Sequence, residues 1–175
     1  VQDHEVRLTN GGTWLVSGAG LERSTGITRV KIINDFIGMA YGLLTLHPEH
    51  YERIQGGAPR DGEPIACVGA GTGLGVAFLT ADVERIGVDP SAYVAFPSEG
   101  GHVDWSPRDD LEAELHRYIK DKTNAAHRCS TERIVSGPGL RAVYDFLLQH
   151  KHFAPHVDKE LDAKISASSE ATAGV

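Results

Sequence analysis

The sequence predicts a mixed α/β fold, because its apolar residues follow two different periods in different parts of the 175-residue chain. Strand-like patterns come mainly first and helical patterns mainly later. We expect strands at residues 5–9, 29–33 and 91–96, and two more within residues 64–79. We expect helices at residues 37–46, 109–122, 140–148 and 158–166. No repeat or coiled-coil heptad is present, so the length fits one ordinary domain or parts of two.

The first of these helices follows directly on the apolar strand expected at residues 29–33. Apolar residues recur at helical spacing from Ile37 to Leu46, and Pro48 ends the pattern. Asn34 and Asp35 therefore lie where a strand becomes a helix. We expect Asp35 to cap this helix, since an aspartate oxygen accepts from the free N–H groups of the first turn. A capping role alone would explain this pair.

A glycine-rich turn divides the two strands within residues 64–79. Every second residue from Gly69 to Gly75 is glycine, which allows positive φ and a close approach of the backbone to a ligand. Successive N–H groups of such a turn, with the Thr72 hydroxyl, suit phosphate oxygens. The turn lacks the lysine of a P-loop and the third glycine of a Rossmann fingerprint. A glycine-rich hairpin that binds nothing is the alternative interpretation.

Two further polar sites follow strand-like or helical segments. Glu99 and His102 lie in a loop after the strand at residues 91–96, and the two glycines between them allow both side chains to face one polar ligand. An ordinary surface pair is the alternative. Glu132 lies in a helical turn expected at residues 131–135, just before a Ser-Gly-Pro-Gly segment that closes this turn and precedes the helix at residues 140–148.

Composition excludes several classes of function. The net charge of −7 argues against a surface that binds nucleic acid. No apolar run approaches the roughly 20 residues of a membrane span, and no signal peptide is found, so we expect a soluble protein. Cys67 and Cys129 lie far apart, which favours a reducing compartment. The nine histidines form no metal-ligand pattern, so we expect no metal site.

Together these segments contain what a phosphate-transferring enzyme needs: a phosphate cradle, a carboxylate base, and polar groups that orient the acceptor hydroxyl. Four motifs also resemble those of the bacterial-type glucokinases in their order and spacing. They are residues 33–36 (Ile-Asn-Asp-Phe), 69–77 (Gly-Ala-Gly-Thr-Gly-Leu-Gly-Val-Ala), 99–107 (Glu-Gly-Gly-His-Val-Asp-Trp-Ser-Pro) and 132–140 (Glu-Arg-Ile-Val-Ser-Gly-Pro-Gly-Leu). Residues 8–10 (Leu-Thr-Asn) followed by Trp14 extend the resemblance towards the start of the chain.

The resemblance implies an actin/hexokinase-like (ribonuclease H-like) α/β fold with two domains, here only in part. Residues 1–45 would be the C-terminal part of the small domain and residues 46–175 the N-terminal part of the large domain. The implied activity is phosphorylation of glucose at O6, with ATP and Mg²⁺, at the entry to glycolysis in the cytoplasm. Glucose and ATP are the implied partners; a homodimer is compatible with the family, and nucleic acid and membranes are not expected.

The resemblance also implies residue roles. Asp35 is the implied general base. The residues implied to bind the other sugar hydroxyls are Asn34, Glu99, His102 and Glu132. The residues implied to contact ATP phosphates are Gly69, Gly71, Thr72 and Gly73.

The chain departs from the family pattern in two places. It lacks the Asp-x-Gly-Gly-Thr-x-x-Arg phosphate loop, which residues 10–13 imitate only superficially, and it lacks an adenosine-contacting segment. We therefore expect both ends to be cuts, the chain to resemble about half of a glucokinase, and these residues alone to be inactive. A non-catalytic sugar-binding or scaffold protein, or a kinase for another hexose, is the alternative. Cys129 alone cannot supply the zinc site of the related ROK kinases.

Overall fold

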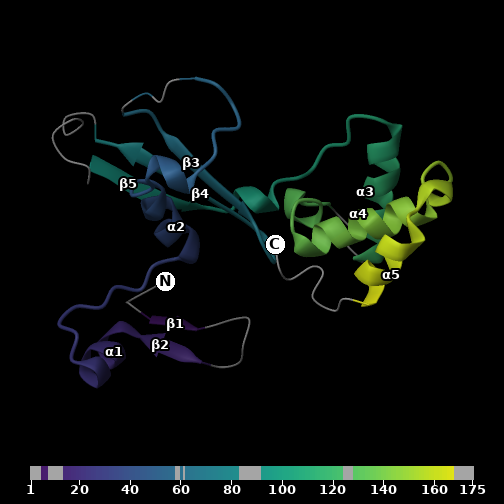
Figure 1. The fold of residues 1–175 in the computed structure, drawn as a ribbon. Coiled ribbons are helices and arrows are strands. Elements are labelled where there is room, and N and C mark those ends of the chain that lie inside the picture. The colour runs from purple at the N-terminus through teal and green to yellow at the C-terminus, as the bar shows by residue number, and fades with distance from the viewer. Residues whose placement is uncertain are drawn as a thin grey trace. The chain divides into compact units, whose positions relative to one another are not determined.

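A computed structural model describes residues 5–7, 14–57, 60, 62–82, 92–123 and 128–167 (Figure 1). The chain forms two compact units, which we describe separately. The first unit consists of residues 1–64 and 79–97, and the second consists of residues 65–78 and 98–175. None of the helices in the described ranges is long and apolar enough to cross a membrane.

The first unit begins with a small antiparallel pair of strands. β1 (Glu5–Arg7) pairs with β2 (Leu15–Ser17), and Val6 lies opposite Val16. The β1 strand confirms part of the strand expected at residues 5–9, and residues 8–13 lie outside the described residues. The strand β2 and the helix α1 (Gly18–Thr25) were not expected from the sequence.

The capping signals of α1 are local. The Ser17 hydroxyl accepts a hydrogen bond from the Gly20 N–H at 3.4 Å, and Gly26 ends the helix with a φ of 75°. Serine at an N-cap and glycine in the left-handed conformation after a helix are common helix boundaries. These two residues were the available signals for α1, but its apolar face is too short to show a clear period.

The prediction of a strand at residues 29–33 is wrong. These residues form no strand, and the Val30 N–H donates at 2.8 Å to the carboxylate of Glu22 in α1. An apolar, β-branched segment becomes a strand only where a neighbouring strand accepts its hydrogen bonds. Here a side chain of the same unit takes the place of such a partner.

The helix α2 (Asp35–Leu43) follows, and its cap differs from the one expected. The residue at the N-cap is Asn34, whose side-chain oxygen accepts from the N–H groups of Phe36 at 3.0 Å and Ile37 at 3.3 Å. Asp35 is instead the first helical residue. The backbone of Asn34 is extended, as an N-cap requires, so the helix begins one residue after it. The helix ends at Leu43, before the limit expected from the sequence.

The helix α2 is attached to a strand of the same unit. The buried residues of α2 are Ile37 and Ala40, and the Tyr41 hydroxyl accepts a hydrogen bond from the Ala95 N–H at 3.2 Å. Ala95 belongs to β5 (Tyr93–Ser98), which confirms the strand expected at residues 91–96. This contact fixes the helix that carries Asp35 against β5.

The expected hairpin is confirmed. β3 (Ile65–Ala70) and β4 (Leu74–Ala81) are joined by three residues, a connection that only antiparallel strands permit. The strand order in the sheet is β3-β4-β5. The glycine turn therefore lies at the tip of a hairpin.

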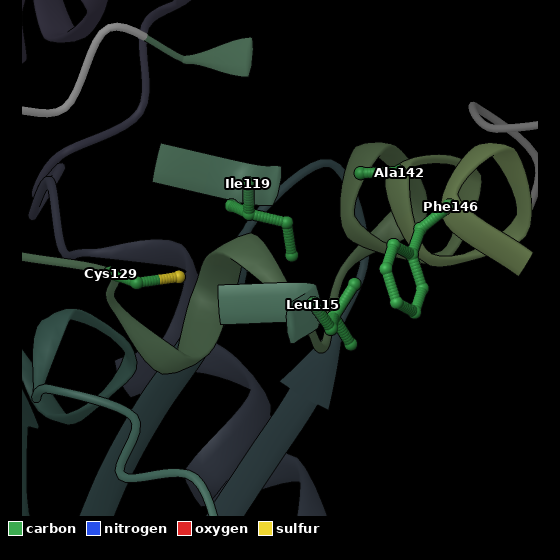
Figure 2. Close-up of a cluster of buried hydrophobic side chains, with 5 residues drawn as sticks. All are labelled: Leu115, Ile119, Cys129, Ala142 and Phe146. Carbon is green, nitrogen blue, oxygen red and sulfur yellow. The ribbon is translucent and has the colours of Figure 1, made fainter. Parts of the chain in front are cut away.

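The second unit also contains three helices, α3 (Asp110–Lys122), α4 (Gly137–Gln149) and α5 (Lys159–Ala167). All three confirm helices expected from periodicity, although α4 begins before residue 140 because Ser136 caps it and Pro138 fits its first turn. Figure 2 shows the core between α3, α4 and the segment around Cys129. Its buried residues are Leu115, Ile119, Cys129, Ala142 and Phe146.

An ion-pair cluster joins α3 to α4 beside this core. Asp145 accepts from Lys122 Nζ at 2.5 Å and from Arg141 Nε at 2.8 Å. Burial alone would raise the pKa of the Asp145 carboxyl, but the hydrogen bonds from Lys122 and Arg141 outweigh this effect and lower that pKa. The cluster therefore stabilises the helix pair in the ionised form of Asp145.

Replacing Asp145 by asparagine should make the stability of the protein less sensitive to acid. A carboxyl whose pKa is lowered on folding stabilises the folded state above its unfolded pKa, and this contribution is lost as the pH falls through the folded value. Between about pH 5 and about pH 2, urea unfolding should show a larger loss of unfolding free energy for the wild type than for Asp145→Asn. Glu160→Gln, which removes an exposed pair with Lys164, is the control. Equal losses in wild type and Asp145→Asn would contradict this role.

Candidate functional site

A short antiparallel pairing in the second unit brings two of the sequence motifs together. The Trp105 N–H donates to the Cys129 carbonyl at 2.8 Å, and the Thr131 N–H donates to the Val103 carbonyl at 2.8 Å. Asp104 and Ser130 form an isolated β-bridge between these bonds. The pairing therefore holds the segment after His102 against the segment that leads to Glu132.

Three predicted site residues meet at this pairing. The imidazole of His102 lies between two carboxylates, with Nε2 at 3.5 Å from Glu99 Oε2 and Nδ1 at 3.8 Å from Glu132 Oε1. Exposed fractions of the side chains are 90% for Glu99, 51% for His102 and 31% for Glu132. The cluster is thus open to solvent on the side of Glu99 and more enclosed at Glu132. It offers both acceptors and a donor to a polar ligand.

One residue that holds this cluster in place, Arg128, was not predicted from the sequence. The Arg128 guanidinium donates to the His102 carbonyl at 2.9 Å, which fixes the backbone that carries the imidazole. Arginine in a polar segment gives no sequence signal of such a role, because its partner is a backbone atom distant in the chain.

The two glycines between Glu99 and His102 allow close packing. They lie at the start of a 3₁₀ turn (Gly100–His102) that packs against the first residues of β4. A Cβ at Gly101 would overlap the carbonyl oxygen of Leu74, and one at Gly100 would lie 3.1 Å from a methyl group of Val76. The loop therefore requires glycine at residue 101, and the space beside Gly100 is tight.

The glycine turn uses its backbone differently from the sequence-based expectation. Positive φ occurs at Gly26, Gly57 and Gly62 among the described residues, and at none of the glycines between Gly69 and Gly75, so the turn does not use the positive φ that glycine allows. A Cβ at Gly73 would lie 2.5 Å from the Glu132 carboxylate, whereas a Cβ at Gly71 would meet no atom within 4 Å.

The hydrogen bonds of the turn leave part of it available to a ligand. The Gly71 N–H donates to the Gly73 carbonyl at 2.8 Å, and the Leu74 N–H donates to Glu132 Oε2 at 2.9 Å. The N–H groups of Thr72 and Gly73 make no hydrogen bond to another described residue. These two donors and the Thr72 hydroxyl remain for an anion.

The Ser-Gly-Pro-Gly segment anchors the first turn of α4 to the glycine turn. The Gly137 N–H donates to the Gly71 carbonyl at 2.8 Å, and the buried Ser136 hydroxyl accepts from the Gly139 N–H at 3.0 Å. A Cβ at Gly139 would lie 2.6 Å from the Ile134 carbonyl oxygen, so glycine is required there as well.

A cavity of about 260 Å³ lies between the glycine turn and α4. Thr72, Glu132 and Ser136 contribute polar atoms to its lining, and Lys122 contributes a positive charge. Groups of three or more metal-ligating side chains are absent from the part of the chain that the structure describes. The polar and basic side chains of this lining can contact an anionic or hydroxyl-rich ligand.

Asn34 and Asp35 belong to the first unit, whereas the other predicted site residues belong to the second. Asp35 Oδ1 accepts from the Phe36 N–H at 2.9 Å, which fixes the carboxylate at the start of α2. Its Oδ2 makes no hydrogen bond to another described residue, so this oxygen is available to take a proton. The Asn34 side-chain oxygen is used by the helix cap, which leaves its amide nitrogen as a donor.

The family model, the curated relatives and the solved structures that match this chain are all described as glucokinases. The family model described as Glucokinase matches residues 1–174. The chain is 39% identical over 153 residues to the glucokinase of Nostoc punctiforme, covering 87% of this chain and 42% of the relative. It is 36% identical over 166 residues to the glucokinase of Salmonella arizonae, covering 94% and 48%. The chain thus spans about half the length of the curated relatives it matches.

Solved structures confirm the predicted fold class. A glucokinase from an Antarctic psychrotroph aligns with a TM-score of 0.71 at 26% identity, over 97% of this chain and 50% of that one. A glucokinase from Balamuthia mandrillaris in complex with glucose aligns with a TM-score of 0.62 at 22% identity, over 99% and 46%. The chain therefore has the α/β architecture of part of a hexokinase-like fold.

Replacing Gly101 by alanine should destabilise the second unit, because the new methyl group would overlap the Leu74 carbonyl oxygen in a packed backbone contact. Overpacking of this kind costs about 1–3 kcal/mol or more. Urea unfolding should show a lower midpoint for Gly101→Ala, with the slope unchanged. Gly56→Ala is the matched control, since a Cβ at Gly56 would meet no atom within 4 Å. Equal midpoints in the two variants would show that the loop does not pack as described.

Proposed function

The chain belongs to the glucokinase family, and we propose that the protein containing it transfers the γ-phosphate of ATP to the 6-hydroxyl of glucose. The observation that carries this proposal is the cluster in which His102 lies between Glu99 and Glu132 beside the glycine turn. Polar groups for a hydroxyl-rich ligand and donors for an anion are thus adjacent within one unit. Such adjacency is what transfer of a phosphoryl group to a sugar requires.

We assign recognition of the sugar to Glu99, His102, Glu132 and Asn34. The carboxylates accept from sugar hydroxyls, and such charge-assisted hydrogen bonds are shorter and stronger than neutral ones. Glu132 is more enclosed than Glu99 and His102, so its hydrogen bond to the sugar would be the least exposed to competition from water. The Asn34 amide nitrogen, left unused by the helix cap, supplies a further donor.

We assign contact with the phosphates of ATP to the turn containing Gly69, Gly71, Thr72 and Gly73. The N–H groups of Thr72 and Gly73 and the Thr72 hydroxyl are the donors that support this assignment. The described residues offer no carboxylate cage for Mg²⁺. Mg²⁺ commonly binds through phosphate oxygens and water, so it would arrive with ATP and neutralise phosphate charge.

We assign the general base to Asp35. As O6 of the sugar attacks the γ-phosphorus, the O6–H proton passes to Asp35 Oδ2, and the bond between that phosphorus and the ADP oxygen breaks. The Phe36 N–H holds Oδ1 and so orients the free oxygen. A positioned base of this kind contributes about 10²–10⁴ in rate.

We also propose the domain assignment and the cellular location of the protein. In the complete fold, residues 1–45 would form the C-terminal part of the small domain and residues 46–175 the N-terminal part of the large domain. The two buried free cysteines, Cys67 and Cys129, support a reducing, cytoplasmic location. Phosphorylation of glucose there would be an entry step to glycolysis.

Asp35→Asn should lower kcat by about 10²-fold or more while changing glucose affinity only modestly. Asparagine keeps the acceptor for the Phe36 N–H but cannot take the proton from O6. A coupled assay of glucose-dependent ADP formation in the full-length protein measures kcat, and calorimetry measures glucose binding. An unchanged kcat would rule out Asp35 as the base. A wild-type protein that binds glucose without turning over ATP would instead be a sugar-binding protein.

Glu99→Gln and His102→Ala should each weaken glucose binding, because a lost hydrogen bond to a polar ligand costs about 1–3 kcal/mol, or roughly 5- to 150-fold. Calorimetric titration with glucose measures this change in the absence of ATP. Glu49→Gln, in the exposed 3₁₀ turn Pro48–His50, is a control that removes a carboxylate elsewhere. If both site variants altered only the affinity for ATP, the assignment of the sugar site would be wrong.

A further inference from the structure

We propose that Gly73 is a positioning residue of the sugar site: it is glycine because the Glu132 carboxylate occupies the space that a side chain at residue 73 would fill. The inference rests on the proposed role of Glu132 in binding glucose. Gly73 would then have a role in sugar binding that is separate from contact with phosphate.

The two oxygens of Glu132 have different neighbours. Oε2 accepts from the Leu74 N–H at 2.9 Å, and Oε1 lies 3.8 Å from Nδ1 of His102. One carboxylate thus spans from the backbone of the glycine turn to the cluster that we assign to the sugar. Its orientation at the sugar depends on its attachment to the turn.

Space at Gly73 is what permits this attachment. A Cβ built at Gly73 would lie 2.5 Å from Oε2 and 3.3 Å from Cδ of Glu132. Gly73 is not among the residues with positive φ, so its backbone conformation alone does not call for glycine. The neighbouring Gly71 differs, because a Cβ there would meet no atom within 4 Å.

The backbone of Glu132 cannot follow a displaced side chain. It lies in the 3₁₀ turn Thr131–Arg133, where the Thr131 N–H is bonded to the Val103 carbonyl and the Arg133 N–H to the Ser130 carbonyl. The end of the side chain, by contrast, can rotate into another rotamer. Alanine at residue 73 would therefore leave the fold intact and turn the carboxylate away from Leu74 and His102.

The site consequently couples the phosphate-binding turn to the sugar. If Leu74 moved, its hydrogen bond would shift the Glu132 carboxylate, and with it the group that we assign to the sugar. Substitution at residue 73 should affect glucose binding even when no nucleotide is present, which a purely phosphate-binding glycine would not do.

The test compares Gly73→Ala with Gly56→Ala in the full-length protein, because a Cβ at Gly56 would also meet no atom within 4 Å and Gly56 lies outside the proposed binding site. Calorimetric titration with glucose, without ATP, should show affinity weakened about tenfold or more for Gly73→Ala, the scale of one lost hydrogen bond. Gly56→Ala should change glucose affinity by less than about twofold. Equal effects of the two substitutions, or no effect of Gly73→Ala, would overturn the inference.

A double-mutant cycle separates positioning from general disturbance of the turn. In a Glu132→Ala background, Gly73→Ala should weaken glucose binding no further, since the carboxylate that it displaces is gone. Additive losses would overturn the inference.

Hydrogen exchange of the Leu74 amide distinguishes failure of this inference from failure of the proposed function. Gly73→Ala should accelerate that exchange, because the bond to Glu132 is lost, whereas Gly56→Ala should not. A wild-type protein that binds no glucose would overturn the proposed function, even if the Leu74 exchange responds as expected. Unchanged Leu74 exchange in Gly73→Ala would overturn the inference whether or not glucose binds.

Discussion

The hydrogen bond from the Leu74 N–H to the Glu132 carboxylate is the contact on which the candidate site depends. It joins residues 58 positions apart, and it bonds a carboxylate to a backbone donor, a charge-assisted combination that is stronger than a neutral one. The antiparallel pairing of residues 103–105 with residues 129–131 carries Glu132 to this position. The loop of Glu99 and His102 then packs on Leu74 through Gly101 and on Val76 through Gly100. Three motifs thus meet at the first residue of one strand.

Helices were predictable from the sequence because their determinants are local. The apolar period and capping residues of α3 and α4 lie within each helix or next to it, and α2 was misjudged only in its cap and its end. The strand expected at residues 29–33 failed for a non-local reason, since the Glu22 carboxylate takes the amide that a neighbouring strand would need. The α1 helix was missed because it has eight residues and little apolar periodicity.

The positions of the site motifs were predictable, but the reasons for their glycines were not. The sequence suggested positive φ around Gly71 and Gly73, whereas the structure shows close approach to a side chain or a carbonyl as the constraint at Gly73, Gly101 and Gly139. Those neighbours are Glu132, Leu74 and Ile134, and only the last is close in the chain. Which atom fills the space beside a glycine depends on tertiary packing, so composition and spacing cannot reveal it. Grouping of Glu99 and His102 was foreseeable, since two residues separate them.

The attachment of α4 to the glycine turn has a mechanical consequence. The Gly137 N–H belongs to the first turn of a 13-residue helix and is bonded to the Gly71 carbonyl. A helix of that length extends about 20 Å and behaves as a stiff rod. Because a stiff helix moves as a whole, displacement of its far end, near His150, would strain the hydrogen bond at the hairpin tip.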